Sequence, residues 1–440
     1  MKRILYPASS AVLLLSTLLA ANAFAAGSHS PAHKHMIALK LCSSTPFGVP
    51  PDKQLSQGIR NGEHLAMYKM RGKLRSVGVK LMPANDMDDA QADGSTYSTD
   101  KEANNARICV ADNHAIGYIG TLNSGAAEVS EPITNQGYMV QVSPANTSPA
   151  LTSFGKYQGS GGRQAQEPAT FHHHIPWVTY YRTVTTDALQ GPAGALYAKQ
   201  HLHVKSVYVI DDKLQYGVGL ASAFQAEASR LGIKVLGHGH VDSSSSAAEA
   251  QTSQAIAQQI SQKRPGMVYC GCDAETIVPL PVAIRRAGFH GPFMGGDALE
   301  NSLYITDEKT ASINNYASSV GPDVAKTSKG FRKLYKTVIP HFFGNPGPQS
   351  YDAPSYDASM IVLTAVYNAA KHHQLKGSIR NMRRTVVHGV RYIHFSGATG
   401  KTSFDNNGDT TNRIISIYKV QGKNWVFRTQ VAPKGFKPAP

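Results

Sequence analysis

The sequence is poor in cysteine and in acidic residues. Its 440 residues include four cysteines, too few for a disulfide scaffold and without the spacing of a zinc finger. Asp and Glu number 29 against 44 Lys and Arg, so the net charge of +15 reflects scarce acids rather than abundant lysine. The basic residues form pairs at most, such as Arg285–Arg286 and Arg383–Arg384, whereas nucleic-acid-binding proteins usually cluster them. We therefore expect no nucleic-acid partner.

Enzyme signatures are also lacking. There is no Gly-x-Ser-x-Gly elbow and no His-Glu-x-x-His helix. Gly397–Thr402 ends like a phosphate-binding loop but has two residues between its glycines where four are needed, so we expect a surface turn. Asp405–Asp409 begins like a calcium loop, but Thr410 and Ser416 occupy the positions that require glycine and glutamate. We predict a protein that is not an enzyme and uses no cofactor.

Long hydrophobic runs are absent outside the N-terminus. Residues 1–25 have a basic start, a mostly apolar run over Ala11–Ala21 and the small-x-small sequence Ala23-Phe24-Ala25, which together predict a cleaved signal peptide. The apolar run is too short for a membrane span, which needs about 20 residues, and no later segment is longer. No cysteine follows the cleavage site, which argues against a lipid anchor. The mature protein is therefore expected to be exported and soluble.

The rest of the chain, in which 41% of all residues are hydrophobic, alternates short apolar runs with helical patterns. This alternation predicts right-handed crossovers and parallel sheets in two successive α/β units. In the second unit, Leu220, Ala223, Phe224, Ala228 and Leu231 share one helix face, and Gly232 is a predicted helix cap. A polar loop is expected around Asp86, Asp88 and Asp89. Strands are expected at 36–42, 79–82, 115–120, 138–143, 206–212, around Val235, 267–270 and 292–294, helices at 54–71, 101–111, up to 262 and 356–373, and a hairpin at 413–427.

Histidine is the one unusual abundance. His172–His174, His201-x-His203 and His238-x-His240 could each present imidazoles to zinc, copper or nickel. None has an accompanying cysteine or carboxylate spacing, so we predict solvated or hydrogen-bonded histidines and no metal site. Cys270 and Cys272 are predicted to be two buried thiols, because a bridge between residues two apart is strained. A Cys42–Cys109 bridge is possible in an oxidising compartment, but the sequence leaves it open.

Polar residues follow the ends of two successive predicted strands. Ligands of open α/β sheets bind at the carboxyl ends of strands, where loops and helix N-termini converge. Ser124-Gly125 follows one strand, and a Ser-Gly pair at a helix start can present a hydroxyl and backbone amides to a carboxylate. The next strand runs into Ser143–Pro149, which is again rich in hydroxyls. Ordinary helix capping would explain either end alone, but two together favour a ligand site.

These motifs carry a resemblance that spans residues 36–427. The chain resembles the substrate-binding proteins of ABC importers for branched-chain amino acids, within the type I periplasmic binding proteins. The motifs that carry it are Ile116–Gly120 with Asn123–Gly125, Val142–Thr152, Arg182-Thr183 with Asp187 and Gln190-Gly191, Asp211–Gly217, and Gly397–Asp405.

The resemblance implies which residues hold a ligand. Ser124 and Thr147 would bind an α-carboxylate, with backbone groups of Ala145 and Asn146 assisting. Tyr216 would close over the ligand from the second lobe, and Asp297 would pair with an α-ammonium, in a place where the family usually has glutamate. Cys272 and Asp273 stand where some members place an aromatic residue, so leucine is not assumed as the ligand.

The resemblance also implies the architecture. We expect two Rossmann-like lobes, lobe one from 36–182 and 321–390 and lobe two from 183–320 and 391–440, joined by a hinge of three crossings. The protein would be a periplasmic monomer that captures a small molecule, an amino acid in the first instance, and delivers it to an inner-membrane ABC permease. The open alternatives are a sensory receptor of the same fold, a binder of an amide, urea-like or aromatic acid ligand, and a histidine-based metal binder.

Overall fold

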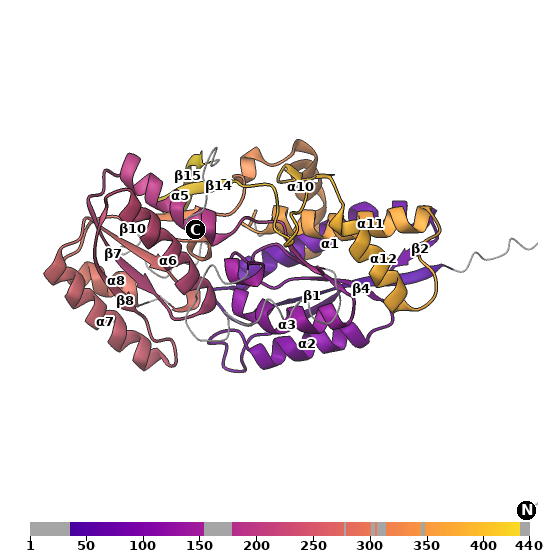
Figure 1. Cartoon of the computed structure of the whole chain (residues 1–440), viewed down its shortest axis with the longest axis horizontal. Helices are drawn as coiled ribbons and strands as arrows, with labels where there is room; N and C mark the ends of the chain where they lie inside the picture. Colours follow the sequence, from indigo (N-terminus) through magenta and orange to yellow (C-terminus); the bar gives the residue numbers. More distant parts are fainter. Residues whose placement is uncertain are drawn as a thin grey trace, which may run out of the picture. The chain divides into compact units, whose positions relative to one another are not determined.

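The computed structural model describes residues 36–153, 178–276, 279–300, 304–305, 314–344 and 348–431. The predicted signal peptide and the histidine run at 172–174 lie outside these residues. Strands and helices alternate along the described chain and form two large sheets and one small one (Figure 1). In the described part, no helix combines the length and apolar character that a membrane crossing needs.

The first sheet is parallel throughout, in the order β2-β1-β4-β5-β6, with β3 also paired to β1. The predicted polar loop is wrong in part, because Asn85–Asp88 forms the strand β3. Its polar residues find partners: Asp86 accepts a hydrogen bond from the Ser43 hydroxyl at 3.0 Å and contacts His64 at 2.7 Å. The strands are β1 (Ile37–Thr45), β2 (Val79–Leu81), β3, β4 (Ala115–Ile119), β5 (Val140–Ser143) and β6 (Tyr180–Arg182).

Six helices pack with this sheet or with one another. Helices α1 and α11 lie side by side (Figure 1), and Gly62 permits their close approach, since a Cβ there would collide with the backbone of Asp352 and Tyr356. The buried positions of α1 recur at helical spacing, as the sequence predicted for this segment. The helices are α1 (Lys53–Ser76), α2 (Thr99–Ala111), α3 (Ser124–Gln136), α10 (Lys329–Phe343), α11 (Asp352–Lys371) and α12 (Ile379–Arg391).

The second sheet has the order β15-β14-β11-β10-β9-β7-β8. The five strands β11, β10, β9, β7 and β8 pair in parallel. The predicted hairpin consists of β14 and β15, and β14 pairs antiparallel with β11. The predicted apolar face of α6 is confirmed by the burial of Leu220, Phe224 and Ala228, and Gly232 follows the helix with φ +71°. The elements are α5 (Asp187–Gln200), β7 (Ser206–Asp211), α6 (Gln215–Arg230), β8 (Lys234–His240), α7 (Ser246–Lys263), β9 (Met267–Gly271), α8 (Leu280–Arg286), β10 (Phe293–Gly295), β11 (Asn315–Ser319), β14 (Ile415–Gln421) and β15 (Asn424–Val431).

We call the first sheet with its six helices lobe one, and the second sheet with α5 to α8 lobe two. The described chain passes between them after β6, after β11 and after α12. At the third passage, the chain turns between β12 (Phe395–Ser396) and β13 (Lys401–Thr402), and the expected surface turn is confirmed only in part, since Gly400 and Lys401 are exposed. Ala398 and Thr399 are buried, because the Asp357 carboxylate of α11 accepts hydrogen bonds from both backbone N–H groups.

All four cysteines are paired. Cys42 of β1 is bonded to Cys109 of α2, the bridge that the sequence left open. Cys270 is bonded to Cys272, so the prediction of two buried thiols is wrong. The chain leaves β9 after Gly271, which brings the two Cα atoms to 5.5 Å, within the range that a disulfide spans.

Candidate ligand-binding site

The two hydroxyl-rich strand ends of lobe one lie next to each other. Ser124 is the first residue of α3, and its hydroxyl accepts a hydrogen bond from the Ser148 backbone N–H at 3.4 Å. Ser124 and Thr147 are both buried. A hydroxyl at a helix N-terminus beside a second hydroxyl suits a carboxylate, because the helix dipole and the O–H donors both favour a negative charge.

The backbone N–H groups of the neighbouring residues Ala145 and Asn146, and the Asn146 side chain, already have hydrogen-bond partners within the protein. The Ser143 hydroxyl accepts hydrogen bonds from both of their backbone N–H groups, at 3.1 and 2.8 Å. The Asn146 side chain donates to the Leu122 carbonyl at 2.9 Å and accepts from the Tyr180 hydroxyl at 2.9 Å. Asn146 therefore positions the loop, and the contact of these two residues with a ligand stays a prediction.

A buried arginine at the end of β6 holds the same loop. The Arg182 guanidinium donates to the carbonyls of Asn146 and Ser148, at 3.1 and 2.8 Å, and also to the Thr152 hydroxyl. Its Nε lies 2.6 Å from the Asp409 carboxylate. Asp409 is the last residue of the segment that resembles a calcium loop. In the structure it forms an ion pair with the buried side chain of Arg182.

Asp297 of lobe two stands at the centre of a hydrogen-bond network. Its Oδ1 accepts from the Gln190 side-chain amide at 2.8 Å and from the Tyr216 hydroxyl at 3.0 Å. Its Oδ2 accepts from the Tyr351 hydroxyl at 2.5 Å. Tyr351 immediately precedes α11 of lobe one, so this contact joins the lobes. Burial raises the pKa of Asp297 although the three donors lower it.

A second set of acidic residues meets where the lobes touch. Asp52 of lobe one shares a hydrogen bond with Glu275 of lobe two, and Asp273 lies close enough to repel both. Burial and the neighbouring charge of Asp273 raise the pKa of Asp52 to about 8. Burial and the charge of Glu275 raise the pKa of Asp273 well above its usual range, and burial and the charge of Asp52 do the same for the pKa of Glu275.

These carboxylates have acceptor atoms to spare. Asp52 Oδ2 and Glu275 Oε2 are buried and accept no hydrogen bond. Asn123, the residue before α3, hydrogen-bonds Asp52, and its own Oδ1 is buried without a partner. Among the residues that the structure describes, no lysine, arginine or histidine forms an ion pair with Asp52, Asp273 or Glu275. The arrangement can accept hydrogen bonds and stabilise positive charge.

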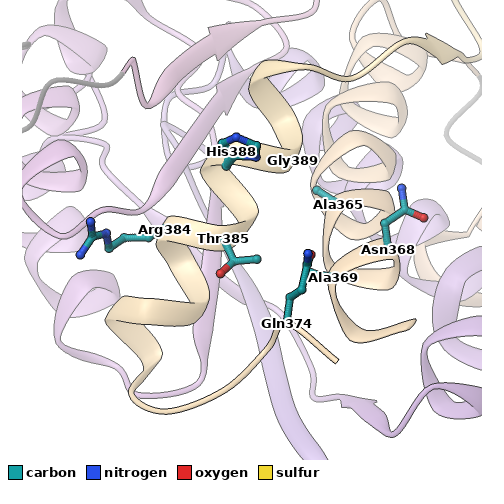
Figure 2. A pocket seen from close by; sticks show the side chains of 8 residues that line it. All are labelled: Ala365, Asn368, Ala369, Gln374, Arg384, Thr385, His388 and Gly389. Atoms are coloured by element: carbon teal, nitrogen blue, oxygen red, sulfur yellow. The ribbon is translucent and has the colours of Figure 1, made fainter. Parts of the chain in front are cut away.

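A pocket of about 400 Å³ lies elsewhere, between α11 and α12 (Figure 2). It forms where Gly389 faces Ala365, and its wall holds neutral or weakly basic groups such as Asn368, Gln374 and His388. Arg384 extends away from the pocket and over the ring of Tyr138, 5.1 Å from its centroid. The residues described above that meet between the lobes form what we call the interlobe network: Asp52, Gln190, Tyr216, Asp273, Glu275, Asp297 and Tyr351. The pocket shares no residue with this network, and we do not assign the ligand to it.

Comparison with known proteins identifies the family of the chain and its fold. The family model "Receptor family ligand binding region" matches residues 84–423. The chain belongs to this family. Its fold is that of solved type I periplasmic binding proteins, with two lobes of parallel sheets flanked by helices.

The chain is similar to curated relatives over most of its length. It is 22% identical over 348 residues to a leucine-, isoleucine-, valine-, threonine- and alanine-binding protein of Pseudomonas aeruginosa, covering 77% of this chain and 82% of the relative. An amino acid binding protein of the same organism is 26% identical over 326 residues, covering 72% and 75%.

Solved structures show the same fold. A leucine-binding protein from Thermotoga maritima superposes with a TM-score of 0.70 at 21% identity, covering 90% of this chain and 99% of that chain. A solute-binding protein from R. palustris in complex with benzoate superposes with a TM-score of 0.69 at 16% identity, covering 90% and 97%.

Several residues of the interlobe network escaped the sequence analysis. Asp52 and Glu275 lie far apart in the sequence and on different lobes, and no local pattern links them. Tyr351 precedes a helix whose predicted start was four residues too late. Gln190 stood in the quoted family motif, and its side chain now proves to be a donor to Asp297.

Proposed function

We propose that this protein binds a small cationic solute between its lobes outside the cytoplasm and delivers it to an ABC permease. The ligand is an amino acid, or a related amine, that carries more than one positive charge. The observation that carries this proposal is the meeting of Asp52 and Glu275, acidic groups of opposite lobes that share a hydrogen bond at the lobe contact and have acceptor oxygens to spare.

Each part of such a ligand has a partner at the site. A carboxylate would lie at Ser124 and Thr147, and its α-ammonium would reach Asp297 Oδ2, which has one protein donor. A side-chain ammonium or guanidinium would lie between Asp52, Asp273 and Glu275, where paired charges in a water-poor setting attract strongly. An aliphatic side chain would leave the spare oxygens of these buried acidic groups without a hydrogen-bond donor, which is costly.

The names of the relatives support the transport part of the proposal. They are described as binding proteins for leucine, isoleucine, valine and other amino acids, and one solved neighbour holds benzoate. An anionic aromatic acid would meet the same acidic groups without donating a hydrogen bond to them, so we consider it a less favourable ligand than a cation. A periplasmic monomer released from its signal peptide without a lipid anchor, with a permease as partner, remains part of the proposal.

The test is a thermal-shift screen of ligand-stripped mature protein. The panel contains lysine, arginine, ornithine, putrescine, leucine, benzoate and zinc chloride. A ligand at 100 times its Kd stabilises the folded protein by about 2.7 kcal/mol. A shift with dibasic compounds and none with leucine supports the proposal. A shift with leucine alone would be compatible with transport but would refute a cationic ligand. A shift with benzoate alone would refute both the positive charge of the ligand and its identity as an amino acid.

A further inference from the structure

Two histidines on the edge strand β8 face one buried aspartate of β7. His238 Nε2 lies 2.7 Å from Asp211 Oδ2, and His240 Nδ1 lies 2.8 Å from Asp211 Oδ1. The facing ring nitrogens and the carboxylate all lie within 4.8 Å of one another. The spacing of residues around the His-x-His pair indicated no carboxylate ligand; the parallel register supplies one by placing Asp211 opposite His240 on the neighbouring strand.

His238 and His240 are two residues apart on β8, so both imidazoles point the same way, and the opposite face carries two glycines. Gly237 packs against the ring of Tyr208 so closely that a Cβ would lie 2.7 Å from it, and Gly239 lies against the same ring. Because side chains alternate along a strand, His238 and His240 both extend from the other face. Their rings are stacked there with centroids 4.9 Å apart.

The second ring nitrogen of His238 has a hydrogen-bond partner on α6. His238 Nδ1 lies 3.0 Å from Gln225 Oε1, so the Nδ1–H tautomer donates to this amide oxygen and leaves the lone pair of Nε2 directed at the Asp211 side. Metal-bound histidines commonly donate their other N–H to such an acceptor.

We propose that Asp211, His238 and His240 bind a divalent transition-metal ion of the Zn²⁺, Ni²⁺ or Cu²⁺ type. Two imidazoles and one carboxylate are a ligand set that these ions favour. The Asp211 side chain is 2% exposed, whereas those of His238 and His240 are 28% and 51% exposed, so the carboxylate is fixed and the imidazoles are accessible from solvent.

Side-chain movements are enough to form the complex. Metal–ligand bonds of about 2.0–2.2 Å in a tetrahedron separate the ligand atoms by about 3.3 Å. Each ring must therefore move away from Asp211 by roughly half an ångström, and the two ring nitrogens, which lie within 4.8 Å of each other, must come to about the same separation. His240 is half exposed and lies at the end of the edge strand, where such a shift meets little resistance. Water would complete the coordination. This site is independent of the solute bound between the lobes.

The experiment measures Zn²⁺ binding to the tag-free mature protein by competition with a chromophoric chelator, and Co²⁺ binding by its visible absorption. The His238→Gln/His240→Gln variant should lose one zinc per chain and the Co²⁺ band. Asp211→Asn should weaken that zinc by about 100-fold, and Gln225→Ala by about tenfold through the lost N–H acceptor.

The chain offers a matched control in His201→Gln/His203→Gln, which removes the same His-x-His spacing from the end of α5. Among the described residues, no carboxylate completes a metal-binding cluster around that pair. This variant should keep the zinc and the Co²⁺ spectrum of the wild type. The proposal is overturned if the His238→Gln/His240→Gln protein, folded by circular dichroism, binds as many zinc ions as tightly as the wild type. Equal losses in both double variants overturn it as well.

Discussion

The contact between Asp52 and Glu275 makes the empty protein sensitive to pH. Two carboxyl groups that share a hydrogen bond need a proton between them, and the pKa of Asp52 is raised to about 8 by burial and by Asp273. In the contacting lobes Asp52 therefore holds a proton at pH 7 that it loses once the lobes separate. Proton affinity is thus higher when the lobes touch, and contact between them weakens as pH rises from about 4 to about 8.

The size of the effect follows from the shift. One pKa unit corresponds to about 1.36 kcal/mol. A carboxyl group whose pKa is about 4 units higher when the lobes touch therefore disfavours lobe contact at alkaline pH by up to about 5 kcal/mol. Water entering the site will reduce this figure. We expect the ligand-free protein to be compact at pH 5 and to open at pH 9.

Small-angle X-ray scattering of ligand-free protein at pH 5 and pH 9 measures this opening. The Asp52→Asn variant removes one of the titrating groups at nearly constant volume and should open less at pH 9 than the wild type, because only Asp273 and Glu275 still lose protons at the contact. Glu102→Gln is the control, since Glu102 is also buried, with a pKa raised to about 7, but it binds Tyr118 inside lobe one. An unchanged scattering profile of the wild type between pH 5 and pH 9 would refute the argument.

Three further changes test the site and its support. Asp297→Ala should weaken binding of an amine ligand by about 2–5 kcal/mol, as for an orphaned buried charge, and calorimetric titration with unaltered affinity would remove Asp297 from the ligand's partners. Arg182→Met should lower the free energy of unfolding, measured by urea denaturation, by about 3–5 kcal/mol, because Asp409 loses its buried partner. A loss under about 1 kcal/mol would contradict the role of Arg182 in holding the loop. Gly62→Ala should cost about 1–3 kcal/mol in the same assay because α11 must move, and a stabilised variant would contradict the close packing.

The alternation of elements was predictable because each strand and helix carries its own local signal. The apolar face of α6, the cap at Gly232 and the terminal hairpin all follow from residues a few positions apart. The strand β3 was missed because its stability comes from partners on β1 and α1, among them Ser43 and His64, rather than from its own polar sequence.

The candidate site was predictable only where it is built from strand ends. Adjacent strands of a parallel sheet end at the same edge, so Ser124 and Thr147 could be placed together from their positions alone. The acidic contact between Asp52 and Glu275 depends on how two lobes meet. The grouping of Asp211 with His238 and His240 depends on strand register, which no local spacing encodes.

The loops of this protein differ in how freely they can be altered, which matters for anyone who would convert it into a fluorescent sensor. The segment around Gly408 looks like a surface turn, but a Cβ at this position would strike the Tyr180 carbonyl, and Asp409 beside it holds Arg182. An inserted reporter domain there would pull on the loop that carries Thr147. The turn at Gly422 is exposed and a side chain there would meet open space, so it is the better point of insertion.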